Sequence, residues 1–157
     1  MKKVFVFFLF VSNFIFSQNY FEIIDLKSFE KIDNYCDLIS TNKNLKIKII
    51  EGEIENLNKE VIGGFSIYVY YDELKHKKRI LQHTSVKSSE TIDCYFYNDE
   101  IVKVIIKEDK FENNELKNLS TAHYYLNKGS IIKTFGENIC SDAQLKKKIE
   151  DVLTFLK

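Results

Sequence analysis

The three histidines are the residues of this chain with the most obvious capacity for acid–base or metal chemistry. His76, His83 and His123 are separated by seven and forty residues, which matches no ligand spacing of known metal sites. Asp93 and His123 occupy equivalent positions in two similar segments and could meet if their strands are neighbours. A catalytic base also needs a nucleophile and an oriented pocket, and no Gly-x-Ser-x-Gly or Cys-x-x-Cys motif accompanies this pair. We therefore expect no metal ion, no cofactor and no catalytic residues.

The cysteines offer redox chemistry instead. The chain has three cysteines, Cys36, Cys94 and Cys140. An exported form of the chain can therefore hold at most one internal disulfide. Cys94 alternates with Ile92 and Phe96, which predicts a buried strand residue that behaves as a small hydrophobe. Cys36 and Cys140 would then form the disulfide by elimination. The alternative is three reduced, buried thiols.

Tyrosines mark the most distinctive surface that the sequence predicts. Side chains alternate across a strand, so the aligned strands divide into two faces. We expect one face to be the core, with Ile67, Val69, Cys94, Phe96, Val102, Val104, Leu126 and Ile132. We expect the other face to be exposed and to form a binding surface, with Tyr68, Tyr70, Asp93, Tyr95, Tyr97, Lys103, His123, Tyr125 and Lys133.

On the second face, Tyr70, Tyr95 and Tyr125 fall at equivalent positions of three hairpins, flanked by lysines. Such a ladder of rings suits the binding of a protein or a carbohydrate, because each ring offers flat apolar area and a hydroxyl at its tip. The alternative is ordinary strand propensity, since tyrosine favours strands and cross-strand aromatic pairs stabilise a solvated sheet.

Two helices and a series of strands must position these residues. Apolar residues at three- and four-residue intervals predict a helix that ends near residues 42–44. Ser28 can cap its start, and the alternative is an earlier start near Tyr20. A second helix follows Ser141, which forms a capping-box pair with Gln144. Between them, β-branched and aromatic runs separated by polar turns predict strands at residues 46–51, 65–71, 78–85, 91–97, 101–107, 121–126 and 131–135.

The connections between these strands are too short for crossover helices, so the strands must pair antiparallel. We therefore predict an α+β fold: an antiparallel β-meander of about seven strands, with an N-terminal and a C-terminal helix packed on one face.

An internal repeat supports the hairpins. Residues 94–104 (CYFYNDEIVKV) align without gaps with residues 124–134 (YYLNKGSIIKT), and residues 69–74 (VYYDEL) begin a third copy. Over about residues 64–135, the chain resembles small secreted bacterial proteins of unknown function with Tyr-Tyr-x-x-x-Gly-x-Leu hairpin repeats, and it is loosely similar to MORN-type repeat proteins. Gly129 is the turn glycine of that pattern, whereas Asp99 departs from it. The resemblance implies a binding or structural module, since such repeats share no catalytic residues.

The first residues of the chain predict its cellular localisation. Lys2 and Lys3 precede an apolar run over residues 4–16, which is the layout of a secretory signal peptide. This run of thirteen residues, interrupted only by Ser12 and Asn13, falls short of the ~20 that span a bilayer. We therefore expect a signal peptide at residues 1–17 and a single domain at residues 18–157, exported to the periplasm or secreted, without stable membrane insertion after cleavage.

Composition narrows the function classes. The chain has 23 basic and 23 acidic side chains, which excludes the strongly basic footprint of a nucleic-acid-binding protein. Five glycines are few for catalytic loops. We expect an exported, non-enzymatic binding protein with a protein partner, for example an inhibitor or immunity protein against an exported toxin or hydrolase. The alternatives are a small exported hydrolase with an unrecognised active site and a glycan-binding module.

Overall fold

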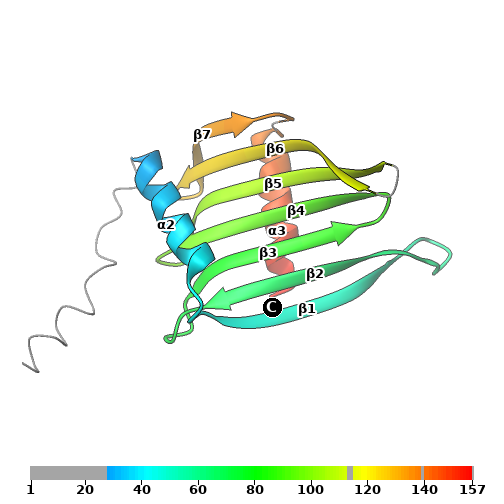
Figure 1. Cartoon of the computed structure of the whole chain (residues 1–157), viewed down its shortest axis with the longest axis horizontal. Helices are drawn as coiled ribbons and strands as arrows, with labels where there is room; N and C mark the ends of the chain where they lie inside the picture. Colours follow the sequence, from blue (N-terminus) through cyan, green and yellow to red (C-terminus); the bar gives the residue numbers. More distant parts are fainter. Residues whose placement is uncertain (1–27, 113–114, 139, 157) are drawn as a thin grey trace, which may run out of the picture.

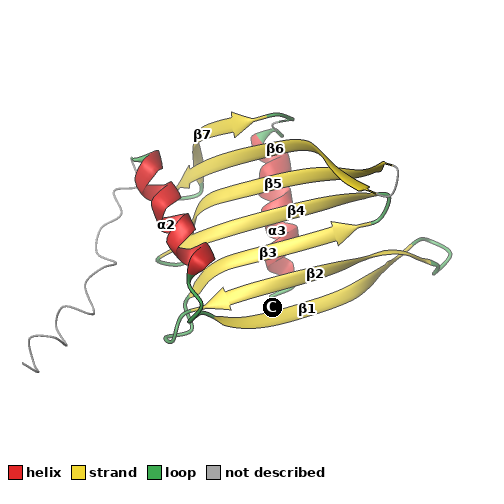
Figure 2. Cartoon of the chain, in the orientation of Figure 1, coloured by secondary structure: helices red, strands yellow, loops and turns green. Residues whose placement is uncertain are grey.

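Seven strands form one antiparallel sheet in the order of the chain (Figures 1 and 2). The computed structural model describes residues 28–112, 115–138 and 140–156, so the predicted signal peptide lies outside the described residues. The elements are α2 (Phe29–Thr41), β1 (Lys46–Glu55), β2 (Val61–Tyr71), β3 (Lys77–Ser85), β4 (Ser88–Tyr97), β5 (Glu100–Glu112), β6 (Glu115–Asn127), β7 (Ser130–Gly136) and α3 (Asp142–Thr154). The predicted α+β meander, with a helix at each end of the sequence, is confirmed.

Both helices begin where the sequence predicts, but they begin differently. Ser141 and Gln144 form the complete capping box at the start of α3, with each side chain bonded to the other residue's backbone. Ser28 occupies the cap position of α2, yet its side chain makes no capping hydrogen bond. The start of α2 therefore depends more on the packing of its apolar stripe than on its cap.

The two helices cover opposite faces of the sheet, so the prediction that they share one face is wrong. Leu145 and Val152 of α3 pack in one cluster with strand residues that include Phe96. Ile32 of α2 packs in a second cluster with strand residues that include Tyr95. Tyr95 and Phe96 are consecutive in β4, and consecutive strand residues point to opposite faces. Figure 1 shows α2 crossing in front of the strands and α3 behind them.

Each of three hairpins contains a β-bulge at the same place. Tyr95 pairs with Lys103, but Phe96 pairs with Ile101, so Val102 is the extra residue of β5. The same register shift occurs after Tyr125 in the β6–β7 hairpin and after Tyr70 in the β2–β3 hairpin.

The bulges correct two of the predicted core positions. Val102 packs with α2 instead of α3, and Ile132, the extra residue of β7, is 40% exposed. Strict alternation would place both side chains on the α3 face, but an extra residue in a strand interrupts the alternation.

The two aligned repeats also share their turns. Asn98 and Asp99 have φ angles of 50° and 62°, and Lys128 and Gly129 have φ angles of 50° and 73°. Positive φ at both central residues of a two-residue loop defines the type I′ turn that connects tightly twisted hairpins. The repeat seen in the sequence is therefore a repeat of hairpin geometry, with turn and bulge both conserved between the two copies.

The cysteines form no disulfide. Cys36, Cys94 and Cys140 are all free, so the predicted bond between Cys36 and Cys140 is wrong. Cys36 lies in the cluster beneath α2, whereas Cys140 packs against the cluster beneath α3. The sheet separates the two sulfurs, because the helices lie on opposite faces. Cys94 is 1% exposed, as its alternation predicts.

Candidate functional site

A row of alternating tyrosines and cations runs straight across six strands on the α2 face. Tyr70 of β2 pairs with Arg79 of β3, and Arg79 pairs in turn with Tyr95 of β4. The register continues in the same way to the β7 edge. We call these residues the tyrosine–cation row: Tyr70, Arg79, Tyr95, Lys103, Tyr125 and Lys133.

The cations of this row lie over aromatic rings. The Arg79 guanidinium carbon is 5.3 Å from the ring centroids of both Tyr70 and Tyr95. Lys103 Nζ is 5.1 Å from the centroid of Tyr125. Cations at this distance are attracted by the negative faces of the rings. The alternation of tyrosines and cations therefore stabilises the contacts between neighbouring strands.

Helix α2 covers the centre of the tyrosine–cation row. Tyr95 and Tyr125 are each 4% exposed and Lys103 is 7% exposed, so the prediction that these side chains face solvent is wrong. Tyrosine rings present apolar area on either face of a sheet, and here that area packs against the apolar stripe of α2. Tyr70 at one end of the row is half-buried, and Lys133 at the other end is exposed.

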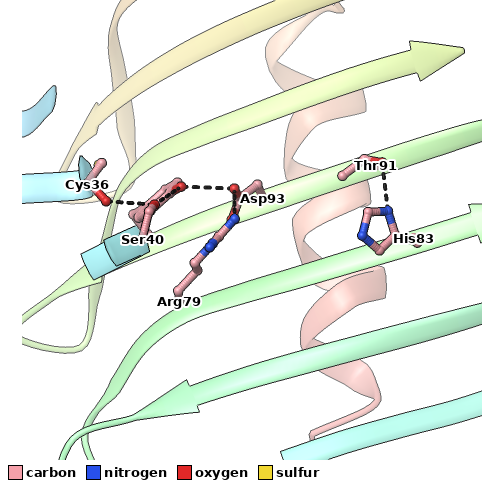
Figure 3. A network of polar contacts seen from close by, with 7 residues as sticks. Cys36, Ser40, Arg79, His83, Thr91 and Asp93 are labelled. Carbon is pink, nitrogen blue, oxygen red and sulfur yellow. Dashed lines mark hydrogen bonds and ion pairs between the residues drawn. The ribbon is translucent and has the colours of Figure 1, made fainter. Parts of the chain in front are cut away.

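A chain of polar contacts connects α2 to the sheet (Figure 3). The hydroxyl oxygens of Ser40 and Tyr95 lie 2.9 Å apart, and the Tyr95 hydroxyl donates to Asp93 at 3.0 Å. Arg79 donates to both carboxylate oxygens of Asp93, from Nε and Nη2, each at 2.8 Å. Such two-pronged bonds are the strongest ion-pair geometry available to arginine. Asp93 is therefore fully engaged in structure.

A second set of polar contacts holds the first half of α2. Lys103 Nζ donates to Asp33 Oδ1 at 2.6 Å, and the Tyr125 hydroxyl donates to the same carboxylate at 2.8 Å. Burial lowers the pKa of Lys103, but its hydrogen bond to Asp33 and the nearby negative groups outweigh burial, so the pKa lies above its usual value. Lys103 therefore remains charged and bonded to α2 at neutral pH.

Beside α2, the same face of the sheet carries a second row that the helix leaves partly uncovered, although Ile105 of this row packs against the cluster beneath α2. Tyr68 pairs with Leu81, and this register extends to both edges of the sheet. Ile49 at one edge is 55% exposed and Phe135 at the other is 45% exposed. Apart from Asp93, the side chains between them are half-buried. We call this set the open row: Ile49, Tyr68, Leu81, Asp93, Ile105, His123 and Phe135.

Polar side chains border the open row on the side away from α2. His83 and Thr91 are paired across β3 and β4, and His83 Nδ1 lies 2.9 Å from Thr91 Oγ1 (Figure 3). Ser66 pairs with His83 on one side, and Lys107 pairs with Thr91 on the other. We call this the polar row: Ser66, His83, Thr91, Lys107 and Thr121.

Asp93 and His123 do not form a catalytic pair. They belong to the same row, but Ile105 of β5 stands between them, since β4 and β6 are not neighbours. Burial lowers the pKa of His123, and the positive charge of Lys103 lowers it further. Among the described residues, no group of three or more His, Cys, Asp or Glu side chains could hold a metal ion. The two side chains that could have formed an acid–base pair are therefore kept apart by β5.

The remaining predicted surface residue, Tyr97, is half-buried, and its ring makes an edge contact with Tyr35 of α2 at 5.5 Å between centroids. Asp33 and Ser40, which hold α2, were not identified from the sequence, and neither was Arg79. One signal could have identified Arg79, which is the only arginine of the chain. It lies in the second strand of a hairpin whose first strand ends in tyrosines, as Lys103 does in the next hairpin.

Comparisons of the chain with protein-family models, with curated proteins and with solved structures found no match. In the part of the chain that the structure describes, no helix has the length and apolar character needed to cross a membrane.

Proposed function

We propose that this chain is an exported, non-enzymatic binding protein that engages a protein partner through its open row. The observation that carries the proposal is the partial exposure of this row beside a helix that crosses only part of the face (Figure 1). Ile49 and Phe135 are exposed at its two ends, and Tyr68, Leu81 and Ile105 are half-buried between them. Apolar side chains that stay accessible on a small protein can mark sites of interaction.

The surroundings of the open row support a protein as the partner. The polar row lies along one side of it, and α2 lies along the other. An apolar centre with a polar, hydrated border is the usual anatomy of a protein–protein interface. Tyr68, Leu81 and Ile105 would be the central contacts, with His83 and Lys107 at the border.

The buried residues of the tyrosine–cation row have a supporting role in this proposal. Tyr95, Lys103 and Tyr125 lie beneath α2 and hold it in place. The helix then forms a rigid wall beside the open row, so that a partner meets a preorganised surface. Tyr70 and Lys133, at the two ends of the row, remain candidates for direct contact.

Within this proposal, we favour an inhibitor or immunity protein that acts against an exported toxin or hydrolase. Such a protein needs no cofactor or catalytic group, because it works by covering a surface of its target. The predicted export of the chain would place it in the same compartment as such a target.

The product of a neighbouring gene is the first partner to test. We expect titration calorimetry to detect binding to the wild-type protein. A Leu81→Glu, Ile105→Glu double variant should weaken that binding at least tenfold, because truncation or charging of central anchors typically removes about 2 kcal/mol or more.

Leu57→Glu is the matched control, because Leu57 is fully exposed in the β1–β2 turn, outside the open row. It should leave the affinity unchanged. Circular dichroism would verify that each variant is folded. Unchanged binding by a folded double variant would contradict the role of the open row, and absence of binding by the wild-type protein would contradict that gene product as the target.

A further inference from the structure

A cavity of about 420 Å³ lies on the α3 face of the sheet, opposite the open row. It is bounded by the middle of α3 and by the two hairpins that end in type I′ turns. Its volume falls within the ~300–1,000 Å³ typical of small-molecule sites. Its interior side chains are all aliphatic: Ile101, Leu126, Ile131, Leu145 and Ile149.

The cavity does not extend to the C-terminal end of α3. At that end, Val152 is fully buried, and Leu153 packs against the sheet cluster, as does Leu156 just beyond the helix. The Phe155 ring, just beyond α3, lies 4.9 Å from that of Phe65. The cavity is therefore a local feature beside a well-packed core.

The mouth of the cavity carries balanced charge. Glu100 and Glu150 supply two carboxylates, and Lys128 and Lys146 supply two ammonium groups. All four residues are exposed. At Gly129, a side-chain carbon would meet no atom within 4 Å, so the entrance is open there. A balanced mouth favours neither an anionic nor a cationic group, so the aliphatic interior must select the ligand.

We infer that this cavity binds the hydrocarbon chain of an amphiphile, with the polar head at the charged mouth. A methylene group occupies about the same volume as a water molecule in the liquid, ~30 Å³, so the cavity accommodates on the order of a dozen methylene groups. This site is separate from the proposed partner surface, because the two lie on opposite faces of the sheet.

Titration calorimetry with alkanols of increasing length tests the inference, at concentrations below their aggregation limits. We expect about fourfold tighter binding per added methylene, because each buried methylene contributes ~0.8 kcal/mol. The gain should stop near the length that fills the cavity. Dodecanol, dodecanoate and dodecyltrimethylammonium should bind within about tenfold of one another.

Two variants and one direct measurement locate the bound chain. Ile131→Phe should weaken dodecanol binding at least tenfold by occupying the cavity, whereas Leu81→Glu on the opposite face should leave it unchanged. In the wild-type protein, nuclear Overhauser contacts should join the methylenes of dodecanol to the methyl groups of Leu126 and Leu145. Contacts to Leu81 and Ile105 instead, or no saturable binding of any alkanol, would overturn the inference.

Discussion

Arg79 and Asp93 form a two-pronged ion pair between β3 and β4, with both nitrogen–oxygen distances at 2.8 Å. Their side chains are only 17% and 11% exposed. The same carboxylate accepts the Tyr95 hydroxyl, which lies beside Ser40 of α2. One ion pair therefore links the sheet, the tyrosine–cation row and the helix that covers it.

Removing the charge of Asp93 should destabilise the fold strongly. We expect Asp93→Asn to lower the free energy of unfolding by about 3 kcal/mol, because it leaves the Arg79 guanidinium partly buried without its counter-charge. Urea denaturation followed by circular dichroism measures this loss.

Two further variants separate the ion pair from general effects of substitution. Arg79→Lys keeps the charge but loses the forked geometry, so its loss should be smaller. An Arg79→Met, Asp93→Leu double variant should lose less than the sum of the two single replacements, because no unpaired charge remains. Additive losses would show that the two side chains are not coupled.

The reactivity of the three thiols should show that no disulfide exists and that Cys36 of α2 is packed against the sheet. We expect three thiols to react with Ellman's reagent after unfolding without reductant, because all three cysteines are free. In the native protein, Cys140 should react first, since Cys36 and Cys94 are buried. Burial raises the pKa of Cys36 to about 12, so little reactive thiolate forms.

Loosening α2 should expose Cys36 selectively. Asp33→Asn weakens the bonds of α2 to Lys103 and Tyr125, so the reaction of Cys36 should accelerate about tenfold while that of Cys94 stays slow. Replacement of Cys36 by alanine identifies its contribution to the kinetics. A single reactive thiol in the unfolded protein would instead mean that a disulfide exists.

Stability should fall at alkaline pH. Burial raises the pKa of Cys36 from an ordinary value of 9.0 to about 12. Burial and the hydrogen bond between Tyr124 and Cys140 raise the pKa of Tyr124 from 10.0 to about 12. Burial also raises the pKa of Cys94 and Tyr95. A group whose pKa is higher in the folded state stabilises fully below its unfolded pKa, and this contribution is lost as pH rises toward the folded value.

The free energy of unfolding should therefore begin to decrease near pH 9 and continue to decrease toward pH 12. We expect the free energy of unfolding to decrease by at least about 2 kcal/mol between pH 8 and pH 11. Urea unfolding at these two values measures it, and Cys94→Ala should reduce the decrease by removing one contributing group. Equal stability at both pH values would contradict this account.

Much of the fold follows from local features of the sequence. Alternation with a period of two predicts the strands, and polar turns with residues such as Gly129 predict the hairpins. Because all the connections between the strands are short, these local elements can assemble only as a meander. The capping box of Ser141 and Gln144 likewise predicts the start of α3 from residues three apart.

The candidate site was less predictable, because the sequence does not state which face a helix takes. The apolar stripe of α2 fits any apolar surface, and tyrosines such as Tyr95 and Tyr125 serve equally well under a helix or in solvent. Bulges that displace Val102 and Ile132 are not visible in an alternation pattern either.

The sequence by itself determined the hairpins, the residue ranges of the two helices and the repeated tyrosine–cation spacing. Each of these depends on neighbouring residues and on backbone geometry. Only the tertiary structure decided that α2 and α3 lie on opposite faces, that Cys36 and Cys140 stay apart, and which row remains open. Those outcomes depend on which distant surfaces bury the most apolar area together, and that is a property of the assembled sheet.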